Sequence, residues 1–167
     1  MKNLTKLAAA SLLLTASSLT YAATENVIAE VRWVNPITLT ETNALQFGLL
    51  STAAVNNDVV SIDTASAVTD TSNLVVGGTQ AAAAITVTAS ASNTIDIIVN
   101  NVVNGTGYAL GTFVCSYDGG AETGCLSTMS VTAVASANLA IGATLTADGN
   151  DVEGQANGSF DVVVAYQ

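Results

Sequence analysis

Apolar and polar residues alternate along much of the chain, in short runs separated by residues that favour turns. The run at the C-terminus shows this most clearly, because Phe160, Val162, Val164 and Tyr166 alternate with smaller or polar residues. A period of two in β-branched and aromatic residues predicts a strand. Chain ends usually fray unless something holds them. We therefore expect residues 159–166 to pair with another part of the fold.

Similar runs occur throughout the chain and predict eleven strands, at residues 26–33, 37–41, 45–50, 59–63, 74–78, 84–90, 94–103, 108–117, 125–134, 143–147 and 159–166. The dipeptide Asn104-Gly105 lies between two of them and is typical of a two-residue β-hairpin turn. Pro36 separates the first two runs, because proline cannot donate a hydrogen bond to a β-ladder. Short strands at regular spacing predict an all-β sandwich or barrel with antiparallel pairing.

The first 22 residues have the layout of a secretory signal peptide. Lys2 and Lys6 precede an apolar run at 7–14, and small residues follow up to Ala22. The run is too short to span a bilayer, which takes about 20 residues. A retained amphipathic helix is the alternative interpretation. We expect cleavage after Ala22, a protein that is periplasmic, on the cell surface or extracellular, and no membrane span after signal removal, since no second apolar segment of that length follows.

The remaining residues, 23–167, have the length of one domain. This part contains thirteen acidic residues and one basic residue, Arg32, so its side-chain charge is −12. A chain with one cation cannot neutralise a row of phosphates, so nucleic acids are excluded as partners. Half of the whole sequence is apolar, which argues against disorder, and its many threonines and valines favour strands.

The two cysteines, Cys115 and Cys125, flank a glycine-rich turn in CSYDGGAETGC. Export favours oxidation, and cysteines on the two arms of a hairpin can reach the spacing of a disulfide. Closing this loop stabilises a fold by about 2.8 kcal/mol in the chain-entropy model. A redox or metal pair is the alternative, but the chain offers no histidine and no further cysteine as ligands.

Catalytic chemistry is sparse in this sequence. Without histidine there is no Ser/His/Asp triad, and removal of the signal peptide leaves no lysine. We expect no enzyme activity and no cofactor. One weak calcium candidate exists in Asp148, Asn150, Asp151 and Glu153, whose oxygen ligands alternate around glycine. The same residues are typical of a polar β-turn, which we favour.

Most of the chain from Ile37 to Gln167 resembles a family of secreted bacterial β-domains known only as a domain of unknown function (DUF4402). The segments that carry the resemblance are ITLTETNALQFG (37–48), AITVTASASNTIDIIV (84–99), MSVTAV (129–134), LAIGATLTADG (139–149) and GSFDVVVAYQ (158–167). The resemblance implies an immunoglobulin-like antiparallel β-sandwich exposed outside the inner membrane. It brings no activity and no catalytic residue.

The last strand is also similar to that of chaperone–usher pilins, which end in alternating apolar residues, a penultimate tyrosine and a glycine fourteen places from the end. The matching residues are Gly154, Phe160, Val162, Val164 and Tyr166. In that family the ending pairs with a periplasmic chaperone and later borders a groove that the next subunit's N-terminal strand fills. The resemblance implies these partners here, with copies of the chain exchanging strands.

The donor strand in this chain would be the start of the mature protein, with Val27, Ala29, Val31 and Trp33 on one face. Two features depart from the pilin pattern: the cysteine pair lies late in the chain, and eleven strands could complete a sandwich without a donor. We expect a secreted structural or adhesive protein, a pilin-like subunit of a bacterial surface fibre. The alternative is a monomeric binding module for a carbohydrate or another surface ligand, with its site on loops.

Overall fold

The computed structural model describes residues 24–150 and 153–167 and divides the chain into two units, Met1–Arg32 and Trp33–Gln167. The expected signal peptide, including its cleavage site, lies outside the described residues. In the first unit, residues 24–32 have exposed side chains and no regular secondary structure. The second unit contains all the strands, and we describe it by itself below.

The described residues of the second unit contain no helix. They form twelve strands: β1 (Thr38–Asn43), β2 (Leu49–Leu50), β3 (Val59–Ile62), β4 (Val68–Asp70), β5 (Val75–Gly77), β6 (Ala83–Thr88), β7 (Thr94–Val103), β8 (Tyr108–Tyr117), β9 (Thr123–Gly124), β10 (Met129–Thr132), β11 (Ser136–Ala147) and β12 (Ser159–Tyr166). Every pairing among them is antiparallel. Among the described residues, no helix is long and apolar enough to cross a membrane.

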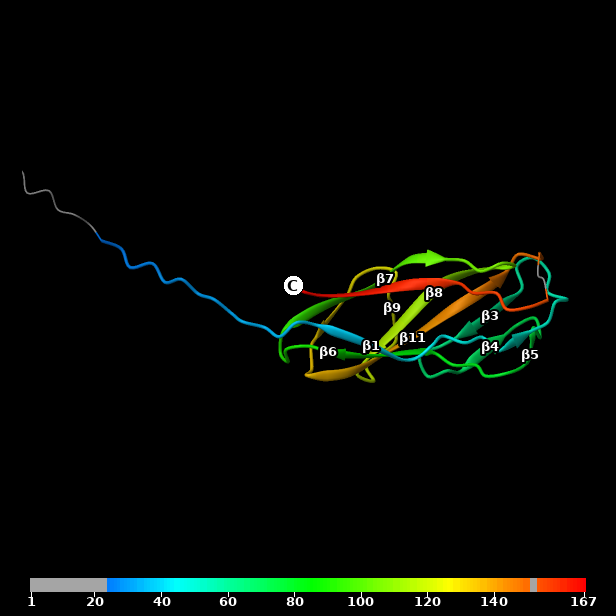
Figure 1. Cartoon of the computed structure of the whole chain (residues 1–167), viewed down its shortest axis with the longest axis horizontal. Coiled ribbons are helices and arrows are strands. Elements are labelled where there is room, and N and C mark those ends of the chain that lie inside the picture. Colours follow the sequence, from blue (N-terminus) through cyan, green and yellow to red (C-terminus); the bar gives the residue numbers. More distant parts are fainter. Residues whose placement is uncertain (1–23, 151–152) are drawn as a thin grey trace, which may run out of the picture. The chain divides into compact units, whose positions relative to one another are not determined.

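The larger sheet has seven strands and is built around β11 (Figure 1). Along one edge, β11 pairs first with β6 through residues 136–141 and then with β3 through residues 143–146. Its other edge pairs with β8, beside which lies β9. β1 extends the sheet beyond β6, and β4 extends it beyond β3. The long central strand thus holds together both ends of the sheet.

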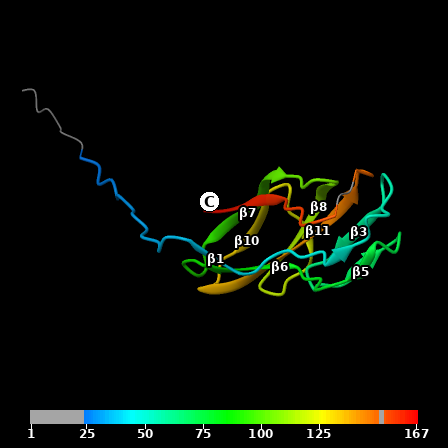
Figure 2. The same ribbon diagram turned by 45° about the vertical axis from the view of Figure 1, so that its right-hand side comes forward.

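The smaller sheet has the order β10-β7-β12, so the last strand of the chain is an edge strand (Figure 2). The short strands β2 and β5 form a separate ladder. Buried side chains from the two main sheets form one core, to which β7 contributes Ile95, Ile97 and Val99, and β11 contributes Leu139 and Ile141. The expectation of an all-β, immunoglobulin-like antiparallel sandwich is confirmed.

The predicted hairpin at Asn104-Gly105 is wrong. The strands on either side of this dipeptide, β7 and β8, belong to different sheets, so the connection crosses from one layer of the sandwich to the other. The type I′ turn that Asn-Gly favours in a hairpin needs positive φ at both central residues. Here the residues with positive φ near this dipeptide are Asn101 and Gly107. Asn104 instead accepts a hydrogen bond from Leu110 N through its side-chain oxygen, at 2.9 Å. With β7 and β8 in different sheets, their apolar faces point toward each other across the core, and both are buried.

Other strand predictions are wrong in extent or in existence. Residues 26–33, predicted as a strand, are in none, and β11 begins at Ser136 rather than at residue 143. The short strands β4 and β9 were not predicted. The segment SANLAIG at the start of β11 is rich in small and polar residues with low β propensity, and its pairing with β6 decides its conformation.

Candidate functional site

The inner face of β12 is only half covered. Phe160, Val162, Val164 and Tyr166 point toward the core and are half-buried, while the residues between them are exposed. Their neighbours on β7 are completely covered: Val162 lies opposite Val99, and Val164 and Tyr166 lie opposite Ile97 and Ile95. The difference arises because β7 has a strand on each side, whereas in the described part of the chain β12 is paired only along one edge.

The strand β1 is the corresponding edge of the larger sheet. Leu39 lies opposite Val87 of β6 and shares its inner face, yet Leu39 is 40% exposed and Val87 is fully buried. All six residues of β1 are exposed, although one edge of the strand is paired with β6. The unpaired backbone edge of such a strand invites pairing with another chain. We call β1 and β12 together the open edge.

At one end of the open edge, three residues tie the two edge strands together. The hydroxyl of Tyr166, at the end of β12, donates a hydrogen bond to the carbonyl of Asn35 at 2.9 Å. The same hydroxyl accepts a hydrogen bond from Ser90 N at 2.6 Å, and Asn35 N donates to the Ser90 hydroxyl at 2.6 Å. The end of β12 is therefore fixed beside the residues that precede β1, so the two strands run in opposite directions along the open edge.

The other end of the open edge is hollow. A cavity of about 670 Å³ lies between residues 45–52, which follow β1, and residues 153–158, which precede β12. Its apolar lining includes Leu45, Phe47, Leu74 and Leu145. Gly154, which the pilin resemblance singles out, also lines this hollow with a φ of 132°. Gly154 therefore lies at the hollow, and the alternating residues of β12 lie on the strand that follows it along the same edge.

The opposite edge of the sandwich is closed. Cys125 follows β9, donates through its backbone N to Phe113 O on β8 at 3.1 Å, and accepts from Val99 N on β7 at 2.8 Å. The chain then continues into β10, so a single segment passes from the larger sheet to the smaller one. The backbone hydrogen bonds of Cys125 thereby join the sheets at this edge, in contrast with the open edge.

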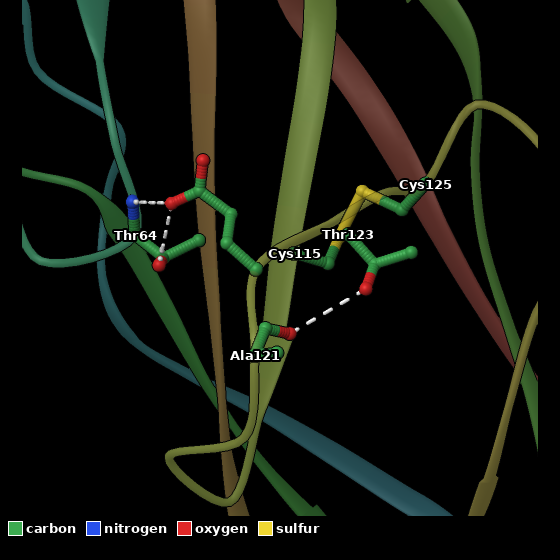
Figure 3. The surroundings of a disulfide bond; sticks show 6 residues. Thr64, Cys115, Ala121, Thr123 and Cys125 are labelled. Carbon is green, nitrogen blue, oxygen red and sulfur yellow. Dashed lines mark hydrogen bonds between the residues drawn. A yellow bond between two sulfur atoms is a disulfide. The ribbon is translucent and has the colours of Figure 1, made fainter.

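The predicted disulfide is present and reinforces this closed edge (Figure 3). Cys115 lies on β8 and is bonded to Cys125, with their Cα atoms 5.8 Å apart, and both side chains are completely buried. The two cysteines are not directly opposite each other, because Cys115 pairs with Thr123 in the β8–β9 ladder. Beside the bridge, Glu122 accepts hydrogen bonds from the backbone N and the hydroxyl of Thr64, at 3.1 and 2.9 Å.

Replacing both cysteines with serine is expected to lower the free energy of unfolding by about 2–3 kcal/mol without abolishing the fold. The bridge closes a short local loop, and the hydrogen bonds of Cys125 with Phe113 and Val99 come from its backbone, so the variant can retain them. Chemical denaturation followed by circular dichroism measures the change. Mass spectrometry of the exported wild type without reductant should show a deficit of two hydrogens. Free thiols in that material would contradict the bridge.

The segment proposed as donor strand has no strand partner in its own chain as far as the structure describes it. Val27, Val31 and Trp33 expose 83%, 72% and 91% of their surface, and Ala29 is also exposed. Large exposed apolar patches mark interaction sites in soluble proteins. The alternation of this segment therefore remains available to a partner.

The calcium candidate forms a turn where the structure describes it. Asn150 N donates to the Asp148 carboxylate at 2.8 Å, and Gly149 between them has a φ of 74°. Asp151 lies outside the described residues, and Glu153 is exposed. Within residues 24–150 and 153–167, no three acidic or cysteine side chains gather closely enough to hold a metal ion.

The carboxylates of Asp63 and Asp70 accept hydrogen bonds from nearby backbone N–H groups. A hydrogen bond from Val75 N, at 2.8 Å, together with bonds from neighbouring backbone groups, holds the pKa of Asp70 below its ordinary value. Asp63 likewise accepts from Ala65 N and Ala67 N. These carboxylates shape loops around β4.

Several residues of the site could not be found from the sequence. Asn35, Ser90 and Leu39 lie far from β12 along the chain, and no motif marks them as its neighbours. Leu45 and Phe47 show an alternating pattern that was interpreted as an ordinary strand, but most of that segment lines the hollow instead.

Comparison with known proteins adds a family and no activity. A family model described as a domain of unknown function (DUF4402) matches residues 37–166. No curated protein and no solved structure matches the chain.

Proposed function

Because this chain belongs to the DUF4402 family, whose description states no activity, we propose its function from the open edge of its own sandwich. The protein is an exported, non-enzymatic structural subunit of a bacterial surface fibre, and copies of it assemble by exchanging strands. The N-terminal segment of one copy, residues 26–34, adds to β12 of the next copy. Strand addition of this kind gains affinity from main-chain hydrogen bonds and specificity from alternate side chains.

One observation carries the proposal: the same domain has an uncovered apolar edge and an exposed apolar segment of matching pattern. Four alternate residues of β12 are half-buried, and four alternate residues of the segment lie in water. Fully burying one valine contributes about 1.5–3 kcal/mol, so covering Val27 and Val31 yields a substantial gain in addition to the new ladder. In a single molecule both apolar surfaces are exposed to water, whereas contact between two molecules covers both of them.

The rival function, a monomeric carbohydrate-binding module, has less support. Such a module would be favoured by exposed aromatic side chains gathered on loops. Of the seven aromatic residues that follow the expected cleavage site, six are buried or half-buried in the sandwich. The seventh is Trp33, in the proposed donor segment. Enzymatic function has less support still, since the sequence lacks histidine and the candidate carboxylates shape turns.

A subunit of this kind also needs protection before it assembles. Uncovered edge strands promote aggregation, and β12 and β1 are both uncovered on one side. We therefore include in the proposal a periplasmic chaperone that pairs with the open edge until another subunit replaces it.

The test removes the donor and leaves the acceptor. Protein that lacks residues 23–34 after export is expected to fold, since all its strands begin at Thr38 or later, and to remain monomeric. A separate peptide of sequence 23–34 should bind it and raise its melting temperature, whereas a scrambled peptide of the same composition should not. Native mass spectrometry gives both the assembly state and the stoichiometry. Full-length protein that stays monomeric at high concentration and high salt would refute strand exchange.

A further inference from the structure

The hollow at the end of the open edge has a size and lining that the strand pairing does not explain. It occupies about 670 Å³ and is lined by Leu45, Phe47, Leu145 and the ring of Tyr108, with Gln46 and Asn157 among its polar residues. Leu45 and Phe47 pack against the core only partly. A hollow lined by both apolar and polar groups is suited to a large side chain that carries one hydrogen-bond donor.

The donor segment offers one side chain of that kind. Trp33 is the only tryptophan in the chain and is 91% exposed. An indole ring is apolar over most of its surface and carries a single N–H, so it is usually buried with that group near a polar partner. One residue, Val34, separates Trp33 from Asn35, whose backbone is held by Ser90 and Tyr166.

The position of Asn35 decides which ends of two subunits can meet. A donor segment leaves its own domain at the Tyr166 end of the open edge, because Asn35 is bonded there. If the donor runs antiparallel to β12 of the acceptor, Trp33 arrives at the hollow, and the Asn35 end of one subunit meets the hollow end of the next. If it runs parallel, Trp33 arrives at the acceptor's Tyr166, and two like ends meet. Unlike ends build an open chain of subunits, whereas like ends allow a closed, reciprocal pair.

Two observations favour the antiparallel arrangement. First, β12 is antiparallel to β7 and β7 to β10, so an antiparallel donor continues the hydrogen-bond pattern of the sheet, which is the more stable pattern per residue. Second, the side chain of Tyr166 already fills its end of the edge, bonded to Asn35 and Ser90, while the other end is hollow.

The spacing of the two segments agrees with this arrangement. When Trp33 lies opposite Phe160, beside the hollow, Val31 falls opposite Val162, and the alternation continues to the end of the strand, with Ala29 and Val27 facing Val164 and Tyr166. The four alternate apolar residues on this face of the donor then each cover a half-buried residue of β12.

We propose that the hollow is the binding site for the Trp33 side chain of a second copy, and that this site joins subunits head to tail. The inference rests on the proposed function and specifies its geometry. Trp33 acts as the anchor of the donor, because it is the largest apolar side chain of the segment and enters the hollow.

The single tryptophan provides a direct measurement in the unmodified mature protein. On assembly, the emission maximum is expected to move to shorter wavelength, and quenching by acrylamide is expected to be largely lost, since Trp33 passes from water into the hollow. Assembly without either change would overturn the inference and leave strand exchange intact.

Engineered cysteine pairs distinguish the two arrangements. Val34→Cys with Ser159→Cys should give a ladder of crosslinked oligomers on a denaturing gel without reductant, because residue 34 falls opposite residue 159 when Trp33 lies opposite Phe160. The matched pair, Val34→Cys with Gln167→Cys, should give none. Crosslinked dimers from the Gln167 pair, with none from the Ser159 pair, would overturn the head-to-tail arrangement. A protein that forms no oligomers at all would instead refute the proposed function.

Discussion

Replacing Val31 with aspartate is expected to abolish assembly of the mature protein while leaving each subunit folded. In the proposed contact, Val31 faces Val162 in an apolar strip along the open edge. A carboxylate buried there without a partner costs about 3–5 kcal/mol. Because 1.4 kcal/mol corresponds to a factor of ten, association should weaken roughly 100-fold or more. Size-exclusion chromatography and native mass spectrometry across a concentration series measure this loss.

The melting temperature of the monomer should not change in this variant. Val31 is 72% exposed and belongs to no strand in its own chain, so aspartate at this position meets only water before assembly. Glu30→Ala is the matched control, because in the proposed donor strand residue 30 faces away from the inner face of β12. This variant should assemble normally. Equal loss of assembly in both variants would show that the segment does not bind through one apolar face. Normal assembly of Val31→Asp would refute its burial.

Replacing Gly142 with alanine is expected to destabilise the fold by about 3 kcal/mol. Gly142 lies in β11 where the neighbouring strand changes from β6 to β3. A Cβ atom there would overlap the carbonyl oxygen of Ile62 and lie 2.7 and 2.9 Å from the carbonyl carbon and Cα of Asp63. All three are backbone atoms, so no side-chain rotation relieves the overlap. β3 would have to move away from the centre of the larger sheet.

Gly111→Ala on β8 is the control for this experiment. Gly111 lies opposite Thr144, two residues along β11 from Gly142, and a Cβ atom there would meet nothing within 4 Å. Removing a glycine from a strand also reduces the conformational freedom of the unfolded chain. The control should therefore be neutral or slightly stabilising. Chemical denaturation followed by circular dichroism compares the two, and similar destabilisation in both would contradict the close approach of β3 to Gly142.

Three strands were predicted with the bounds that the structure has: 94–103, 108–117 and 159–166. Each is at least eight residues long and rich in β-branched and aromatic residues, so its local sequence already favours the extended conformation. The inward set on β12, from Phe160 to Tyr166, was also predicted, because side chains on a strand alternate between its two faces. The disulfide was predicted from two cysteines near one turn in a chain that we expect to be exported.

Prediction failed where pairing rather than local pattern decides the structure. Residues 136–142 form half of the central strand, although alanine, asparagine and glycine favour strands little, because β6 and β8 pair with that segment on both sides. Residues 26–33 show a clear strand pattern and are in no strand of their own chain. A strand pattern indicates only that a segment can join a sheet. Whether it does so depends on whether another strand is free to pair with it.

The sequence by itself determined the class of the fold, the inward faces of its longest strands, the disulfide and the acidic character of the chain. These properties depend on residue type and on a local period of two, which a single chain displays directly. Only the tertiary structure decided that Asn104-Gly105 crosses between the sheets, that Tyr166 holds Asn35, and that the edge between β1 and β12 is open with a hollow at one end. These features arise from contacts between residues up to 131 positions apart. A local sequence pattern does not show which distant segments will pack together.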